Sequence, residues 1–106
     1  MKFAKLINFL TFLTIFCINN VFADSNNLAG KQKSETCLGC HAVPGYNNIY
    51  PTYKVPKLGG QHSDYIKSAL KSYQKMERGH NTMHANAQGL TDEDIDQIAK
   101  YFESNQ

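Results

Sequence analysis

The stretch Cys37-Leu38-Gly39-Cys40-His41 decides how the rest of the chain is interpreted. Two cysteines two residues apart, followed at once by a histidine, form the pattern required for covalent attachment of a c-type haem. The two thiols form thioethers with the porphyrin, and the histidine then lies where it can bind the iron as proximal ligand. The motif therefore predicts one covalent haem c, attached through Cys37 and Cys40, with its iron bound by His41.

Residues 1–23 have the pattern of a secretory signal peptide. Lys2 and Lys5 supply the positive start, an apolar run follows, and the final Val-Phe-Ala places small residues at the −3 and −1 positions of a cleavage site. The run is short for a membrane span, which needs ~20 apolar residues. We therefore expect cleavage rather than retention as a membrane anchor, and a periplasmic domain formed by residues 24–106.

Composition limits the functions that this domain can have. The formal net charge of the whole chain is +2, and Lys2 and Lys5 of the signal account for it, so residues 24–106 are formally neutral. A neutral domain lacks the positive excess of a nucleic-acid-binding protein. Its two cysteines are both in the motif. Because small exported domains usually need disulfides or a metal for stability, we expect the haem to stabilise the fold and the chain without haem to be poorly folded.

The remaining pattern predicts an all-α domain with three main helices and two long loops. We expect helices over residues 28–37, over residues 63–77, and from Thr91 to near the end of the chain. The segments between them, 42–60 and 79–89, contain many turn-forming residues and no convincing strand. A long loop in a compact domain needs a reason, and wrapping around a haem supplies one.

Apolar residues at helical spacing define the faces that should be buried. In the middle helix these residues are Tyr65, Ile66, Ala69, Leu70 and Tyr73. In the last helix they are Ile95, Ile98, Ala99 and Phe102, and Thr91 with Asp94 resembles a capping box at its start. The first long loop would line the haem with Tyr46, Ile49, Tyr50, Tyr53, Val55 and Leu58.

The second axial ligand of the iron is less well defined by the residues alone. The candidates are Met76, Met83, His62, His80 and His84. Methionine and histidine are both known haem ligands. Met83 lies between two predicted helices, where its side chain can reach the far face of the ring, but His80 and His84 share that segment. The residue chemistry favours Met83 and leaves a histidine open.

From residue 28 to residue 102 the chain resembles a class I cytochrome c, especially the small exported bacterial type that also occurs as one half of dihaem cytochromes. The residues that carry the resemblance are Gly30, Cys37–His41, Pro56–Gln61, Tyr65, Leu70, Tyr73, Arg78, Met83, Ala87, Leu90 and Ile98–Phe102. The resemblance implies a small cytochrome c fold, with its helices and long loops wrapped around one covalent haem.

The resemblance also implies specific roles around the haem. Met83 would be the distal iron ligand. The backbone carbonyl of Pro56 would accept a hydrogen bond from the free ring nitrogen of His41 and so fix the orientation of that ligand. Arg78 would lie near a haem propionate.

One further position matches the family pattern, and two depart from it. Gly30 would be the point where the first and last helices cross, facing Tyr101. Ala42 and Met76 stand where glycine is common in this family. Both departures bear on loop geometry rather than on the ligands.

The function that these observations predict is electron transfer in the periplasm. With His41 and Met83 both bound, the iron has no open position for a substrate, and no catalytic constellation is evident, so we expect no enzymatic activity. The partners would be redox proteins, membrane-bound or periplasmic, that bind briefly through a small contact area. A group of lysines would steer an acidic partner or would simply be a solvated face: Lys54, Lys57, Lys67, Lys71 and Lys75.

Two other functions are compatible with parts of the pattern. A dithiol oxidoreductase would use Cys37 and Cys40 without haem, but the βαβ context of a thioredoxin-like fold is absent. A haem-based sensor would leave Met83 unbound and accept a gas at the iron. An absent haem absorption spectrum would indicate the first, and carbon monoxide binding to the reduced protein would indicate the second.

Overall fold

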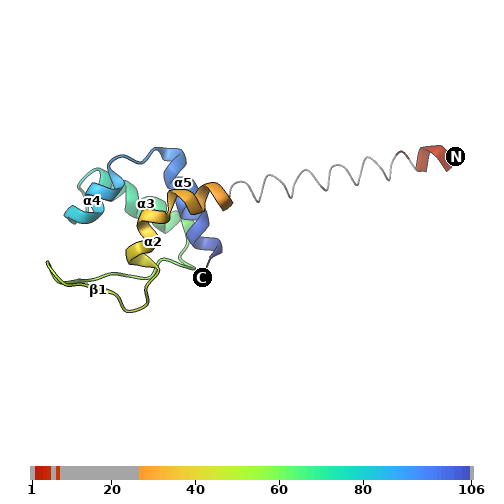
Figure 1. The fold of residues 1–106 in the computed structure, drawn as a ribbon. Helices are drawn as coiled ribbons and strands as arrows, with labels where there is room; N and C mark the ends of the chain where they lie inside the picture. The colour runs from red at the N-terminus through yellow and green to blue at the C-terminus, as the bar shows by residue number, and fades with distance from the viewer. Residues whose placement is uncertain (1, 6, 8–26, 106) are drawn as a thin grey trace.

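The computed structural model describes residues 2–5, 7 and 27–105, and the folded domain lies in the last of these ranges. Helical residues 27–33 are followed by α2 (Glu35–His41), α3 (Ser63–Gln74), α4 (Asn81–Ala87) and α5 (Asp92–Ser104), as Figure 1 shows. The predicted cleavage site lies outside the described residues, so the signal peptide stays a prediction. In the described part of the chain, no helix has both the length and the apolar character needed to cross a membrane.

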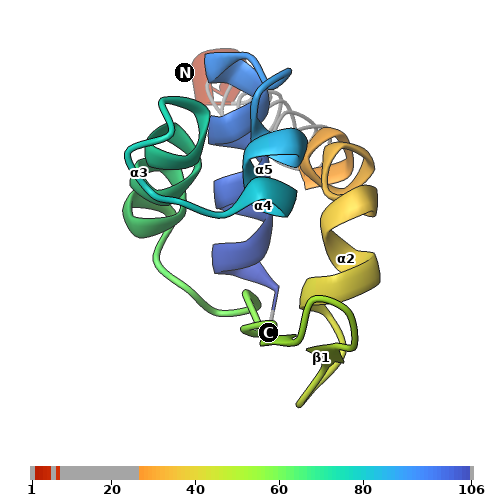
Figure 2. The same ribbon diagram turned by 90° about the vertical axis from the view of Figure 1, so that its left-hand side faces the viewer.

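The core forms where α3 and α5 pack together. In Figure 2, α5 runs between α3 on one side and α2 on the other, with α4 in front. Ile66 and Leu70 are the buried residues of α3, and the buried residues of α5 are those predicted from its periodicity, Ile95, Ile98, Ala99 and Phe102. The all-α prediction is confirmed, with one more helix between α3 and α5 than the sequence indicated.

The first predicted helix is interrupted at Ser34. Residues 27–33 are helical, Ser34 forms a turn, and α2 then carries the whole cysteine–histidine motif. The prediction of one helix ending at Cys37 was therefore wrong: the chain turns at Ser34, and the helix that follows continues past Cys37 to His41, because the first strong turn former after the motif is Pro44.

The crossing of the first and last helices is confirmed. A Cβ atom built on Gly30 would lie 2.6 Å from the carbonyl oxygen of Gln97 and 3.0 Å from Cβ of Tyr101. Glycine is therefore required here by the close approach of the α5 backbone, which explains a residue that is otherwise unfavourable inside a helix.

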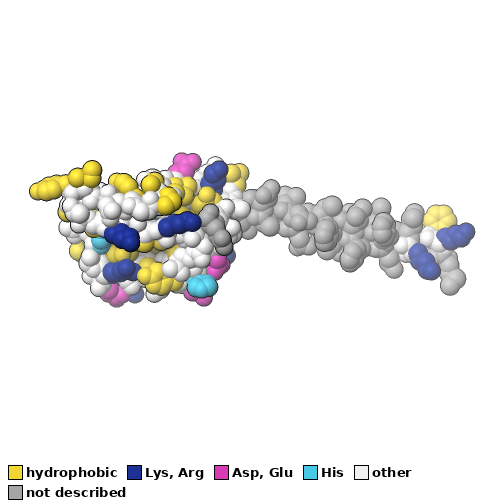
Figure 3. Space-filling view, turned by 90° about the horizontal axis from the view of Figure 1, so that it is seen from below, with side chains coloured by type: hydrophobic (Ala, Val, Ile, Leu, Met, Phe, Trp, Pro, Cys, Tyr) yellow, Lys and Arg dark blue, Asp and Glu magenta, His cyan; other side chains and the backbone are white. Residues whose placement is uncertain are grey.

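The segment from Ala42 to Gly60 is not entirely irregular. It contains a short antiparallel hairpin, β1 (Asn47–Asn48) paired with β2 (Tyr53–Lys54). Ile49 and Tyr50 lie in the turn between the strands and are 88% and 95% exposed, so the prediction that they line the haem was wrong. The strand pairing places them at the tip of the hairpin, which forms the hydrophobic projection at the left of the folded domain in Figure 3.

The segment after α3 also differs from its prediction. The helix α3 ends at Gln74, three residues early, and Met76 has a φ of 56°, in the left-handed region that favours glycine. The conformation explains why glycine is common there in the family that the chain resembles. The loop predicted over residues 79–89 contains α4, a helix without an apolar repeat that could have indicated it.

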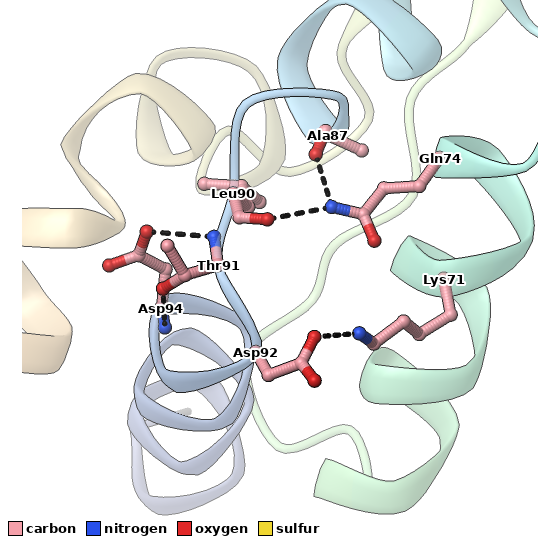
Figure 4. Close-up of polar contacts among 7 residues, drawn as sticks. All are labelled: Lys71, Gln74, Ala87, Leu90, Thr91, Asp92 and Asp94. Carbon is pink, nitrogen blue, oxygen red and sulfur yellow. Dashed lines mark hydrogen bonds and ion pairs between the residues drawn. The ribbon is translucent and has the colours of Figure 1, made fainter.

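The capping box that begins α5 is confirmed. The backbone N–H of Asp94 donates to the Thr91 hydroxyl at 3.1 Å, and the backbone N–H of Thr91 donates to the Asp94 carboxylate at 3.0 Å (Figure 4). The same carboxylate forms an ion pair of 2.8 Å with Lys33. The pair connects the helical segment 27–33 to the start of α5, beside the crossing at Gly30.

This ion pair leads to a prediction about stability and pH. The Lys33 ammonium, followed by the Thr91 hydrogen bonds, lowers the pKa of Asp94 from 3.8 to about 2. A carboxyl with a lowered pKa stabilises the fold above its unfolded-state pKa, and this stabilisation is lost as the pH falls through the folded-state value. We expect Asp94→Asn to melt at a lower temperature than the wild type at neutral pH, and the difference to vanish between pH 4 and pH 2. Circular dichroism melts of both proteins measure this; a difference that is constant over that range would contradict it.

Candidate haem site

The two thiols and the histidine of the motif are carried by α2. Cys37 is half-buried and Cys40 exposed, and neither forms a disulfide. His41 is the last residue of the helix and only 8% exposed. Cys37 and His41 are four residues apart, so their side chains leave the same face of α2. All three residues line one cavity.

The ring of His41 has a defined tautomer. Its Nδ1 lies 2.7 Å from the backbone carbonyl oxygen of Pro56. A carbonyl can only accept, so Nδ1 carries a proton, and in the neutral imidazole the lone pair is therefore on Nε2. The contact is the one that the family resemblance pairs with His41. It leaves Nε2 as the nitrogen available to a metal, with the ring orientation fixed by the hydrogen bond at its other side.

The cavity beside the motif has a volume of about 260 Å³. A single water needs only ~10–15 Å³, so the cavity has room for a much larger group. All five residues of the predicted apolar face of α3 line it, together with Ile98 of α5. The first loop contributes Tyr53, Val55 and Leu58 of the predicted lining, but not Tyr46. An apolar chamber with two thiols and an available imidazole nitrogen fits a covalently attached haem.

Met83 reaches the cavity from α4. The side chain is half-buried and lines the same cavity as His41. Its backbone N–H donates to Nδ1 of His80, the N-cap of α4, at 3.3 Å. The expectation that Met83 lies in a loop was wrong, because this cap and hydrogen bonds to α3 support a helix there. Met83 is therefore presented by a defined helical turn.

Among the other candidates for the distal ligand, only His80 lines the cavity. Met76 is 65% exposed and His62 is exposed at the start of α3. The Nδ1 of His84 donates to the backbone carbonyl of Tyr73 at 2.8 Å, away from the cavity lining. These positions reduce the set of possible distal ligands to Met83 and His80, and Nδ1 of His80 is already engaged with the backbone of Met83.

Arg78 lies at the edge of the same cavity. Its Nη1 donates to the Tyr65 hydroxyl at 3.4 Å, and its guanidinium carbon lies 4.9 Å from the centre of the Tyr73 ring. The hydrogen bond that Arg78 donates to Tyr65 raises the pKa of Arg78, so the side chain is fully charged at physiological pH. The structure shows no ion pair between Arg78 and a carboxylate among the described residues, which leaves this charge available to an anionic group in the cavity.

Comparison with known proteins is consistent with this geometry. The family model of cytochrome c matches residues 28–106. The chain belongs to the cytochrome c family. This cytochrome is an electron-transfer haem protein that carries one covalently bound haem c. The class I resemblance found in the sequence is thereby confirmed.

Individual relatives extend the comparison. The cytochrome c-554(548) of Halomonas halodenitrificans is 42% identical over 81 residues, which cover 74% of this chain and 94% of that protein. The cytochrome c6 of Cyanidioschyzon merolae is 34% identical over 94 residues, covering 87% and 88% of the two chains. The cytochrome c4 of Thiocapsa roseopersicina is 37% identical over 75 residues, covering 70% of this cytochrome but 37% of c4, so that likeness is to part of a longer protein.

The environment of Cys37 bears on the alternative dithiol chemistry. Burial raises the pKa of the Cys37 thiol above its ordinary value. Reactive cysteines of thiol–disulfide enzymes have a lowered pKa, because the thiolate is the nucleophile. The surroundings of Cys37 are therefore unlike those of a redox-active dithiol.

The lysines proposed to steer a partner are not equivalent. Lys67 pairs with Asp96 at 3.1 Å and with Asp64 at 3.5 Å, and Lys71 pairs with Asp92. These two lysines are thus partly neutralised within the chain. Lys54 lines the cavity, and the structure shows no such ion pair for it in the described part of the chain.

Sequence reasoning missed the residues that fix α4 beside the cavity. The Tyr53 hydroxyl donates to the Thr82 hydroxyl at 3.2 Å, and the Tyr53 and His80 rings are 4.6 Å apart edge to face. Gln74 connects α3 to the end of α4. These contacts join residues far apart in sequence around a helix that the periodicity did not show, so no local signal indicated them.

Proposed function

We propose that this cytochrome is a periplasmic one-electron carrier whose haem iron is bound by His41 and Met83. The observation that carries the proposal is that both motif cysteines, His41 and Met83 line the same apolar cavity. The thiols come from α2 and the methionine from α4, so a haem attached through Cys37 and Cys40 would be enclosed between these helices.

Different residues would bind the haem iron, set its reduction potential and pair with a haem propionate. When bound, the haem supplies an iron that changes between the ferric and ferrous states. His41 offers Nε2, and Pro56 holds its Nδ1 proton, which keeps the ring oriented and makes Nε2 a stronger donor. The uncharged thioether of Met83 favours ferrous iron and so raises the reduction potential. Arg78 places a positive charge where a haem propionate can pair with it.

Two filled axial positions explain why we propose a carrier rather than an enzyme. A substrate would need to displace Met83, which α4 and its cap hold against the cavity. Dithiol chemistry is disfavoured by the raised pKa of Cys37. The sensor alternative requires an iron position that no protein side chain occupies. Met83 lines the cavity and could bind there, so the structure does not favour this alternative.

Partner binding would be brief and would use the face where the cavity opens. We propose membrane-bound or periplasmic redox proteins as donors and acceptors, with no nucleic acid and no small-molecule substrate. Lys67 and Lys71 form ion pairs within the chain, so the lysines that would steer a partner are Lys54, Lys57 and Lys75. Exposed charges of this kind change association rates more than affinity.

The attachment sites and the signal peptide can be tested by one measurement. We expect the mass of the exported protein to equal residues 24–106 plus one haem, because the domain has a single motif and no third cysteine. Intact mass spectrometry and peptide mapping should place both thioethers on Cys37 and Cys40. A haem that acidified solvent extracts would contradict covalent attachment, and a mass that retains residues 1–23 would replace cleavage by anchoring.

A further inference from the structure

The helix that carries Met83 is too short to hold its position alone. The helix α4 has seven residues, whereas isolated helices shorter than ~12–15 residues are marginal in water. Its position beside the cavity must therefore depend on contacts with the rest of the domain. The strongest polar contacts lead from α4 to the C-terminal end of α3.

Gln74, the last residue of α3, joins the two helices. Its Nε2 donates to the carbonyl oxygens of Ala87 and Leu90, at 2.8 Å each (Figure 4). Both partners are carbonyls and can only accept, so the amide nitrogen must face them. The last carbonyls of any helix lack partners within the helix, and Gln74 supplies one to Ala87, the C-terminal residue of α4, which is fully buried.

A second hydrogen bond acts beside the first. The Nδ1 of His84, in the middle of α4, donates to the backbone carbonyl of Tyr73, the residue before Gln74. The end of α3 therefore contacts α4 at its middle and at its C-terminus. Met83 adjoins His84, so a shift of α4 relative to α3 would move the Met83 side chain within the cavity.

We infer that Gln74 is a positioning residue for Met83: its two hydrogen bonds hold α4 where the Met83 thioether reaches the haem iron. The inference rests on the proposed axial ligation by Met83. Gln74 does not line the cavity and touches no haem-binding atom. Its effect is on the fraction of molecules in which Met83 is bound.

The decisive variant is Gln74→Glu in the haem-loaded protein. The carboxylate has nearly the shape of the amide but cannot donate, and it would face two carbonyl oxygens. Gln88→Glu is the matched control, because it puts the same charge next to the same end of α4, at an exposed position whose side chain makes no hydrogen bond within the described part of the chain. Gln74→Met removes both hydrogen bonds without adding charge and serves if the Glu variant does not accumulate.

Two measurements report on Met83 directly. The near-infrared thioether-to-iron charge-transfer band shows whether methionine is bound, and the affinity of the ferric protein for added imidazole rises as the methionine is released. We expect Gln74→Glu to weaken the band and to raise the imidazole affinity about tenfold, as expected for the loss of two partly buried hydrogen bonds. Gln88→Glu should match the wild type in both.

The outcomes separate this inference from the proposed ligation. If Gln74→Glu and Gln74→Met melt at lower temperature but keep the wild-type band and imidazole affinity, Gln74 has a structural role only and the inference is wrong, while Met83 ligation stands. Equal effects in Gln88→Glu would also overturn it, because charge rather than hydrogen bonding would be the cause. If the wild-type protein lacks the band, Met83 is not the ligand and both ideas fail.

Discussion

Met83→Ala is expected to abolish the near-infrared thioether band, lower the reduction potential and allow carbon monoxide to bind the ferrous protein. Alanine cannot reach the iron from α4, so one axial position would open. The thioether favours ferrous iron, and each tenfold loss of that preference lowers the potential by about 59 mV. We expect a fall on the order of 100 mV, or roughly two such steps. Covalent attachment should persist, because Cys37, Cys40 and His41 are unchanged.

Redox titration and visible and near-infrared spectra, with and without carbon monoxide, measure these effects. Met76→Ala is the matched control, since this methionine is 65% exposed and does not line the cavity. It should leave the band and the potential unchanged. Survival of the band in Met83→Ala would contradict the axial assignment, and loss of the sixth ligand in His80→Ala or His84→Ala alone would reassign it to a histidine.

The wild-type protein provides a separate test of function. If its ferrous form binds carbon monoxide readily, an axial position is open and the sensor interpretation replaces the carrier. If histidine proves to be the distal ligand, electron transfer remains possible, but at a lower potential than methionine would give. The carrier proposal and the Met83 assignment can therefore fail independently.

The parts of the fold that the sequence predicted are those with strong local periodicity. The buried residues of α5 repeat at helical spacing, and Thr91 with Asp94 marks its start, so both its face and its boundary were predicted. The apolar face of α3 was also predicted, but its role was only partly clear. That face lines the haem cavity as well as packing against α5, which the spacing alone cannot distinguish.

The parts that the sequence did not predict depend on contacts made only in the folded chain. The sequence of α4, Asn-Thr-Met-His-Ala-Asn-Ala, has no apolar repeat. The helix forms because His80 caps its start, His84 donates to a carbonyl of α3, and Gln74 donates to the carbonyl of Ala87 at its end. The hairpin likewise depends on pairing across a turn, which moves Ile49 and Tyr50 outward.

The candidate site divides in the same way. Cys37, Cys40 and His41 form a local motif, so their chemistry could be predicted directly from their spacing. Pro56 and Met83 are 15 and 42 positions from His41. Only family resemblance connected Pro56 to it, whereas residue chemistry favoured Met83 and the resemblance then singled it out. The structure brings Pro56 into hydrogen-bond contact with His41 and Met83 into the same cavity. Neither the local motif nor the family resemblance indicated Gln74, because its partners lie on, or just after, a helix that was not predicted.

Replacing both motif cysteines, Cys37→Ala with Cys40→Ala, is expected to leave the domain largely unfolded. The haem can no longer be attached, and the cavity of about 260 Å³ would be left without the group that fills it. Without the haem, the apolar side chains that line this space would be exposed to water, and a domain this small has little other apolar burial to stabilise it. Few other apolar residues are available to compensate, because the face of α3 is itself part of the cavity wall.

Far-UV circular dichroism and thermal melts of the double variant, purified without haem, measure the effect. We expect much reduced helix content and no cooperative melt. The single variants Cys37→Ala and Cys40→Ala each retain one possible thioether and should be intermediate, in proportion to the haem they still bind. A double variant that is helical and melts cooperatively near the wild-type temperature would mean that α3 and α5 form a sufficient core alone. The cavity would then be a preformed binding site rather than a space that the haem must fill for the chain to fold.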